Sequence, residues 1–248
     1  MTFECRAVRY EFAALEPIYF PAGKAGNMLR GAFGMLPDVE EIFRPRSAEP
    51  SGLKDPPRPF VFRAAHLESC GFKPGEKFQF EVFLFDERIP AEVFGGIWSR
   101  RASLVGFVIR PVSVNFEPQP AEAMEVKFLT PTELKPAGPP EFSILLARCR
   151  DRVSTLRALY GPGPLPIDFR KMGADAAKIR MVRCELKNQE FERYSSRTGQ
   201  IHPLGGFTGE ARYEGKLDEF VPYLRAAEAT GVGRHTVWGK GAIAVAIS

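Results

Sequence analysis

The stretch of residues 231–241 combines glycine with positive charge. Within eleven residues it holds four glycines, two fixed cations and one imidazole: Gly231, Gly233, Gly239, Gly241, Arg234, Lys240 and His235. Glycine lets a partner approach the backbone N–H groups closely, and cationic side chains pair with phosphate oxygens. The loop therefore favours binding of a polyanion. The loop matches no established phosphate-binding motif, and the alternative is that it is only a flexible connection. The apolar segment that follows it, residues 242–247, is predicted to be a buried strand.

A second basic stretch lies between residues 170 and 197. It contains eight lysines and arginines against four acids, and two aromatic residues, Phe191 and Tyr194, lie among them. Cations interleaved with rings that can stack on bases are typical of proteins that hold single-stranded RNA. The alternative is a solvent-exposed hairpin of ordinary charge.

The chain has only three histidines, and each could be structural or chemical. His66 follows a short predicted strand, which favours a structural role. His202 and His235 lie in segments of the basic half flanked by glycine or proline, and loops of this kind commonly carry catalytic groups. No Ser-His-Asp, paired-carboxylate or metal-ligand arrangement can be assembled from the spacing, and the four cysteines are too far apart for a structural zinc site.

The composition is that of an ordinary globular protein. Of the 248 residues, 44% are hydrophobic and 26% are charged, and the formal net charge is +4. Because this excess is small, a basic surface has to come from the placement of the charges. The sequence shows neither a secretory signal nor an apolar stretch of membrane-spanning length, so we expect a cytoplasmic protein with reduced cysteines and no membrane partner.

The elements that must position these residues follow from hydrophobic periodicity. In the first half, four strands are predicted at residues 5–14, 60–64, 77–85 and 102–116. A short helix is predicted at residues 25–35, with Lys24 at its start and Arg30 in its middle, and a weaker helix at residues 89–98. The order is that of the split βαββαβ unit.

The second half repeats this order of elements. A polar, proline-bearing segment at residues 115–125 makes the best boundary, which gives domains at 1–118 and 124–248. Beyond it we predict strands at 126–129, 178–194, 201–213 and 242–247, and helices at 141–160 and 216–229. Four arginines lie off the apolar face of the first of these helices, either solvated or facing phosphate: Arg148, Arg150, Arg152 and Arg157. The predicted class is α+β, with two tandem ferredoxin-like (βαββαβ, RRM-like) domains.

Six short motifs occur in a fixed order along nearly the whole chain. They are RGAFG at 30–34, PGE at 74–76, FLTPT at 128–132, RYSS at 193–196, PLGGFTG at 203–209 and the glycine-rich loop at 231–241. In this order and spacing the chain resembles the CRISPR repeat-processing endoribonucleases of the RAMP superfamily. The block at 203–209 and the glycine-rich loop are the most diagnostic parts.

The resemblance implies an enzyme that cuts CRISPR precursor RNA within its repeats without a metal or other cofactor. In that chemistry the 2′-OH attacks the adjacent phosphate and leaves a 2′,3′-cyclic phosphate and a 5′-OH, with an acid, a base and a cation assisting. The candidate catalytic residues are His235 and His202, with Lys24 stabilising charge. The candidate RNA-binding residues are Arg30, Arg193, Arg197, Gly231, Gly233, Arg234, Gly239, Lys240 and Gly241. The expected partners are CRISPR repeat RNA and other CRISPR-associated proteins. The protein is expected to be a monomer or a homodimer.

The chain departs from this family at its first helix. Many relatives carry a histidine on or near that helix, whereas residues 21–36 contain none and offer only Lys24 and Arg30 as ionisable groups. The protein then uses His202 or His235, or a Lys/Tyr pair, or it is a non-catalytic RNA-binding RAMP subunit of a CRISPR effector complex. A third hypothesis is a small-molecule enzyme on a ferredoxin-like fold, because a fold alone fixes no function.

Overall fold

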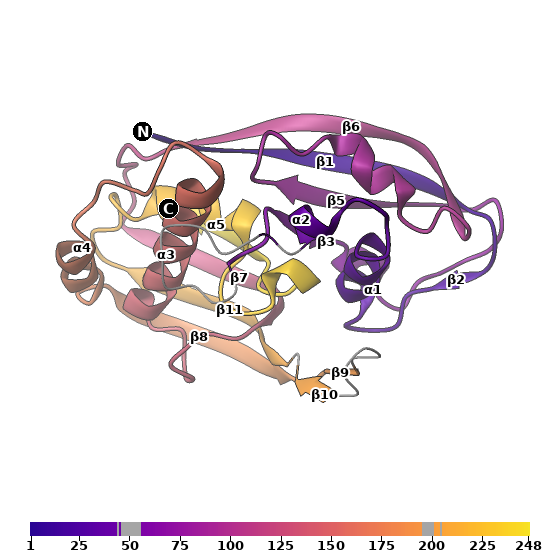
Figure 1. The fold of residues 1–248 in the computed structure, drawn as a ribbon. Helices are drawn as coiled ribbons and strands as arrows, with labels where there is room; N and C mark the ends of the chain where they lie inside the picture. The colour runs from indigo at the N-terminus through magenta and orange to yellow at the C-terminus, as the bar shows by residue number, and fades with distance from the viewer. Residues whose placement is uncertain (44, 46–55, 195–200, 204) are drawn as a thin grey trace.

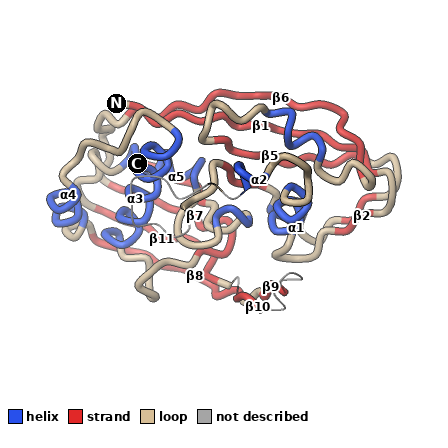
Figure 2. The backbone as a smooth tube through the Cα atoms, viewed as in Figure 1, coloured by secondary structure: helices blue, strands red, loops and turns tan. Residues whose placement is uncertain are grey.

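The computed structural model describes residues 1–43, 45, 56–194, 201–203 and 205–248. It contains two four-stranded antiparallel sheets, which form the upper and lower layers in Figure 1, and the helices α1, α3 and α5 lie between them in this view and in the tube of Figure 2. No helix among the described residues is long and apolar enough to cross a membrane.

The N-terminal sheet has the strand order of a ferredoxin-like unit. Its strands are β1 (Thr2–Ala14), β3 (Phe60–Arg63), β5 (Lys77–Leu84) and β6 (Ala102–Asn115), arranged β3-β5-β1-β6. Helix α1 (Ala25–Phe33) connects the first two, and the 3-10 helix η2 (Ala91–Gly96) stands where the weaker helix was predicted. Smaller elements complete this half: β2 (Ile18–Tyr19), α2 (Glu40–Phe43), η1 (Ala65–Leu67) and β4 (Gly71–Phe72).

The C-terminal sheet repeats that order. Its strands are β7 (Ala123–Thr132), β8 (Arg180–Gln189), β11 (Gly206–Glu214) and β12 (Ile243–Ile247), arranged β12-β7-β11-β8. The remaining elements are α3 (Phe142–Tyr160), α4 (Phe169–Ala176), β9 (Glu192–Tyr194), β10 (Ile201–Pro203), α5 (Val221–Thr230) and η3 (Thr236–Trp238). The protein is thus an α+β chain with tandem ferredoxin-like units, as the periodicity predicted.

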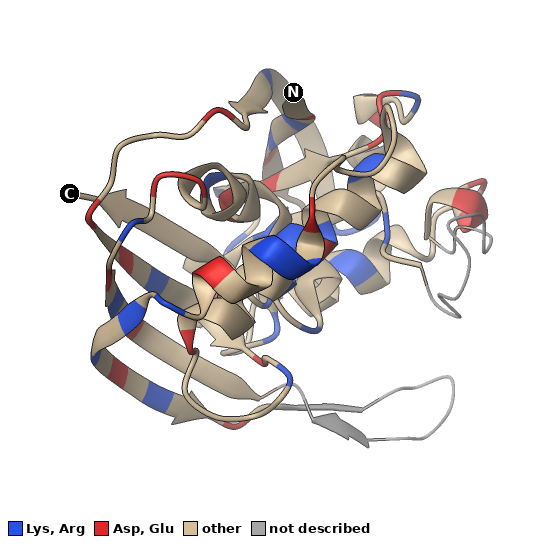
Figure 3. Ribbon diagram, turned by 90° about the vertical axis from the view of Figure 1, so that its left-hand side faces the viewer, with Lys and Arg blue, Asp and Glu red and all other residues tan. Residues whose placement is uncertain are grey.

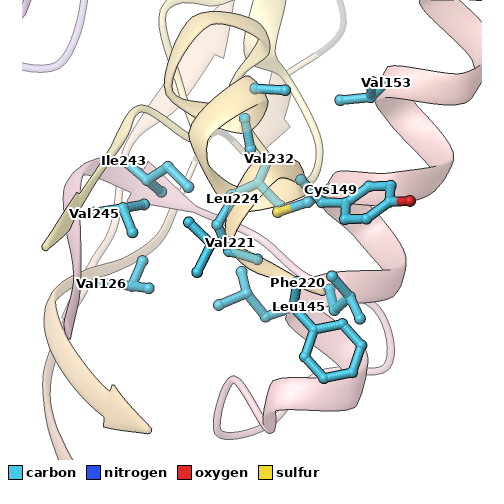
Figure 4. Packing of buried hydrophobic residues seen from close by; sticks show 14 of the residues in the cluster. Val126, Leu145, Cys149, Val153, Phe220, Val221, Leu224, Val232, Ile243 and Val245 are labelled. Carbon is cyan, nitrogen blue, oxygen red and sulfur yellow. The ribbon is translucent and has the colours of Figure 1, made fainter. Parts of the chain in front are cut away.

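Strand β1 serves both hydrophobic cores because its side chains alternate between the two faces of the sheet. Val8, Tyr10 and Phe12 pack into the N-terminal core, whereas Phe3 and Cys5 join the C-terminal core. In the C-terminal core, side chains from α3, α5 and the sheet meet around Cys149, as Figure 4 shows. The two units therefore share packing, and the boundary between residues 118 and 124 stays a prediction.

Several elements of the C-terminal unit differ from the prediction. The long strand expected at 178–194 ends at Gln189 and resumes at Glu192, which leaves Phe191 in the connection between β8 and β9. The helix expected at 216–229 begins only at Val221, because Pro222 stands in its first turn. Proline lacks a backbone N–H, and N–H groups in the first turn have no partner within the helix, so proline is tolerated there. Helix α4 was not predicted from the sequence.

Three of the four arginines of α3, Arg150, Arg152 and Arg157, form structural hydrogen bonds, which differs from both predicted roles, whereas Arg148 is exposed as the solvated alternative predicted. Arg150 donates to the carbonyl oxygen of Phe169 at 2.9 Å, and Arg157 donates to that of Gly163 at 3.1 Å. Arg157 also bonds the carbonyl oxygen of Thr2, which ties the helix to the first strand of the chain. Arg150 and Arg157 are buried, so neither forms part of a solvated or phosphate-facing surface.

Candidate functional site

The glycine-rich loop, residues 231–241, lies against helix α1 and the edge strand β3. A side-chain carbon on Gly26 of α1 would stand 2.6 Å from the carbonyl oxygen of Trp238, so the absence of a side chain there lets the loop approach the helix backbone. The guanidinium carbon of Arg30, on the same helix, lies 5.4 Å from the Trp238 ring centre and 4.4 Å from that of Phe43. The fold therefore brings Arg30 to the loop.

His235 is held in place from two sides. Its ring stacks on that of Trp238, and its Nε2 lies 3.6 Å from Oε2 of Glu133, which follows strand β7. The other oxygen of Glu133 accepts a hydrogen bond of 2.9 Å from Arg234. His235 also has a left-handed backbone, with φ at 63°. Its side chain stays 18% exposed, so a fixed imidazole reaches solvent beside an exposed arginine and a carboxylate.

The loop uses most of its own N–H groups. Gly231, Gly239 and Gly241 donate to the carbonyl oxygens of Ala227, Thr236 and Pro131, at 2.8, 3.0 and 3.1 Å. All four loop glycines have φ between 67° and 79°, a conformation that side chains disfavour. We expected these glycines to present N–H groups to phosphate, and for Gly231, Gly239 and Gly241 the structure corrects that expectation, since their N–H groups are already bonded. For Gly233 the role stays a prediction.

Two arginines anchor the loop at the end of α5. Arg63 of β3 donates to the carbonyl oxygens of Glu228 and Ala229, at 3.2 and 3.1 Å, and Arg152 of α3 donates to that of Thr230 at 2.8 Å. These are terminal carbonyls of the helix, where cations are favoured. Burial lowers the pKa of Arg63 to about 10 and that of Arg152 to about 9. Both remain cations at neutral pH and hold the start of the loop.

The first helix contributes Lys24 as well as Arg30. Lys24 occupies the position before the first residue of α1, and its side chain is exposed. Lys240, by contrast, is buried: it is 3% exposed, and its Nζ donates to the carbonyl oxygen of Gly23 at 2.9 Å. The structure therefore corrects the prediction that Lys240 contacts RNA, because its charged group faces the interior.

The predicted basic hairpin is largely neutralised on its outer face. Arg183 of β8 lies 2.6 Å from a carboxylate oxygen of Glu125 and 2.8 Å from one of Glu210. Lys127 lies 3.7 Å from the same two carboxylates, and blue and red bands accordingly alternate along this sheet in Figure 3. The strands β8, β7 and β11 thus carry an ion-pair ladder, which corrects the expected basic edge at Arg183, while the tip of the hairpin lies outside the described residues.

The remaining predicted residues are placed as follows. His202 and Arg193 face each other in the β9–β10 ladder, but their side chains, and the whole of Arg197, lie outside the described residues. His66 lies with its Nε2 2.9 Å from the carbonyl oxygen of Gln79, a contact that suits the structural role favoured for it. No cluster of His, Cys, Asp and Glu among the described residues is placed to hold a metal ion.

Sequence reasoning missed two residues of the site. Trp238 lies within the glycine-rich loop, and this position in the sequence could have identified it as a residue of the site. Glu133 follows the FLTPT motif but lies 102 positions before His235, and nothing local in the sequence links the two.

The second half of the chain matches a known family. Residues 126–243 match the family model described as CRISPR-associated endoribonuclease Cas6. No curated protein matches the sequence.

Solved structures share the fold over nearly all of the chain. The product complex of Thermus thermophilus Cas6 (TTHB231) is 16% identical, with a TM-score of 0.62 over 98% of this chain and 100% of that one. The product complex of Cas6 (TTHA0078) is 18% identical, with a TM-score of 0.56 over 97% and 99%. A partial Cas6-RT-Cas1–Cas2 complex is 9% identical, with a TM-score of 0.63 over 99% of this chain and 46% of that longer chain.

Proposed function

We propose that this chain belongs to the family of the CRISPR-associated endoribonuclease Cas6, whose model matches residues 126–243, and that it cuts CRISPR precursor RNA within its repeats without a metal ion. One observation carries the proposal. His235 is held between the carboxylate of Glu133 and the ring of Trp238, and Arg30 of α1 contacts the same ring. The imidazole and Arg30 of the first helix therefore lie at one junction of the two units.

The residues at this junction supply what the reaction needs. The 2′-oxygen bonds to phosphorus, the bond from phosphorus to the 5′-oxygen breaks, the 2′-OH proton passes to a base, and an acid supplies a proton to the departing 5′-oxygen. His235 can accept or donate a proton, since imidazole exchanges protons near neutral pH. Lys24 and Arg30 can oppose the charge that grows on the phosphate oxygens. His202, which pairs with Arg193 in the β9–β10 ladder, stays the second candidate for proton transfer.

RNA recognition is proposed for the exposed side of the loop. Arg234 is 51% exposed, and it stands next to His235 and Gly233, so it can meet a phosphate beside the reacting one. Arg30, Arg193 and Arg197 remain candidates for contacts to the flanking nucleotides. We propose that the protein acts in the cytoplasm as a monomer or homodimer and works with other CRISPR-associated proteins.

The second candidate function is RNA binding without cleavage. It is favoured by the first helix, where residues 21–36 contain no histidine. Such a protein would bind repeat RNA tightly and in a salt-sensitive way, and His202→Ala and His235→Ala would leave that binding unchanged.

A gel assay with end-labelled repeat RNA separates the two functions. We expect cleavage in the presence of EDTA, and no cleavage when the nucleotide before the scissile phosphate carries a 2′-deoxyribose. Products with a 2′,3′-cyclic phosphate identify the reaction. A requirement for magnesium, or cleavage of the 2′-deoxy RNA, would contradict the proposed chemistry, and stable binding without product would favour the binding subunit.

A further inference from the structure

Three distant segments of the chain meet at Gly23, two residues before helix α1. Its carbonyl oxygen accepts the 2.9 Å hydrogen bond from Lys240, and its N–H donates to Oε2 of Glu68 at 2.8 Å. Both backbone polar groups of Gly23 are therefore used, one by the glycine-rich loop and one by the N-terminal unit.

The third segment is the connection between β8 and β9. A side-chain carbon on Gly23 would overlap the ring of Phe191, and the φ of Gly23 is +69°, so only glycine suits this position. The same ring lies 4.7 Å from the Nζ of Lys240, within the range of a cation–π contact. Gly23, Phe191 and Lys240 thus form one packed junction, which we term the Gly23 junction.

The surroundings of Lys240 are unsuited to a phosphate contact. A lysine that binds phosphate extends a hydrated ammonium into solvent, whereas this ammonium is inside the protein and burial lowers its pKa. Removing a charged group from water is unfavourable unless a partner compensates it. Here the carbonyl of Gly23, the Phe191 ring and the nearby Glu68 carboxylate provide that compensation.

The position of this junction relates the two halves of the proposed site. Lys24 and Arg30 follow Gly23 on α1, and His235 precedes Lys240 by five residues. A bond between Lys240 and Gly23 therefore limits how far α1 can move from the loop. We propose, resting on the proposed function, that Lys240 is a positioning residue, which sets α1 against the glycine-rich loop and makes no contact with RNA.

Kinetics and binding of Lys240→Met test this proposal. Methionine keeps the length of the side chain and removes the hydrogen-bond donor. We expect the single-turnover cleavage rate at saturating protein to fall at least about tenfold, because misplaced catalytic groups slow the chemistry. The slope of log Kd against log salt should stay unchanged. A lower slope would show that Lys240 neutralises a phosphate, and an unchanged rate would show that the Gly23 junction does not position the site.

The matched control is Arg234→Met, which removes an exposed cation from the same loop. This variant should lower the salt slope by about 0.7, the value for one phosphate contact on a single strand. Gly23→Ala perturbs the junction from its other side, and it should reproduce the rate loss of Lys240→Met with an unchanged slope. Thermal unfolding of each variant shows whether it is folded.

Acylation of the unaltered protein tests the burial of Lys240 without any substitution. With an amine-acylating reagent and mass spectrometry, Lys24 should react in the free protein, and Lys240 should stay unmodified with and without repeat RNA. Reaction of Lys240 in the free protein, followed by protection on adding RNA, would overturn the proposal.

Fluorescence separates failure of this inference from failure of the proposed function, because it needs no RNA. The chain has two tryptophans, so in a Trp98→Phe background all indole emission comes from Trp238, which packs on α1. Lys240→Met should shift that emission to longer wavelength as water reaches the loosened contact. Unchanged emission would overturn the inference even if the protein cuts RNA, whereas a red shift in a protein that cuts nothing would contradict the proposed function alone.

Discussion

The ring of His235 lies parallel to that of Trp238, with ring centroids 4.6 Å apart and an interplanar angle of 8°. Stacking of this kind restricts the rotation of the imidazole. Together with the Glu133 carboxylate, 3.6 Å from its Nε2, this stacking restrains the orientation of His235 within the glycine-rich loop. A fixed orientation matters because proton transfer depends on the direction of the donor and acceptor atoms.

His235→Ala should lower the single-turnover cleavage rate by about 100-fold or more, the usual range for loss of a general acid or base. The affinity for repeat RNA should change little, since Arg234 and the helix cations remain. His66→Ala is the matched control, because His66 bonds Gln79 outside the site, and it should cut at the unaltered rate. Equal cleavage rates for the two variants would show that His235 does not take part in the reaction, and His202 would be the remaining candidate for proton transfer.

Arg183→Gln should leave the salt dependence of RNA binding unchanged. Its guanidinium is paired with two carboxylates, those of Glu125 and Glu210, whereas Arg234 is paired with one, so the charge of Arg183 is already balanced within the sheet. Filter binding of repeat RNA at several salt concentrations measures the slope. A reduction by about 0.7, as predicted for Arg234→Met, would mean that RNA displaces the ion-pair ladder.

Arg63→Met should lower the free energy of unfolding by about 2–4 kcal/mol, because it leaves two terminal carbonyls of α5 without their donor. Arg9→Met removes a nearby arginine whose partner is Glu81, and this pair is largely exposed. Exposed pairs contribute about 0–1 kcal/mol, so the second variant should be close to the unaltered protein. Urea unfolding of both variants makes the comparison, and similar losses would contradict a structural role for Arg63.

The stability of the protein should fall at alkaline pH because of Cys5. Burial raises the pKa of its thiol from 9.0 to about 12. Between these values the unfolded chain has lost the proton that the folded protein keeps, so the folded state binds more protons and the free energy of unfolding decreases as pH rises. One such thiol accounts for about 1.4 kcal/mol per pH unit.

Cys5→Ala should remove that part of the pH dependence. Urea unfolding of the two proteins between pH 8 and pH 11 gives the difference directly, since every other titrating group is common to both. Parallel curves would show that the Cys5 thiol ionises equally readily in the folded and unfolded chains.

The sequence by itself determined the order of elements in both units. The alternation in β1 and β5 and the apolar seam of α3 predicted these elements to within a few residues, because side-chain periodicity is a local property of the chain. The charge pattern also singled out the glycine-rich loop, the first helix and the basic hairpin as candidate sites, and their roles stay predictions. Where one strand became two around Phe191, local pattern gave no warning, since the break accommodates a contact with Gly23.

Only the tertiary structure decided what the charged residues do. Lys240 and Arg183 look alike in the sequence as cations of a basic half, yet one bonds a carbonyl 217 positions away and the other is neutralised by Glu125 and Glu210. The same holds for Glu133, which reaches His235 through the pairing of β7 with β12. The sequence gives the charge of each side chain. The burial of that side chain and its bonding partners depend on which distant segments pack together, and this packing is a property of the whole fold.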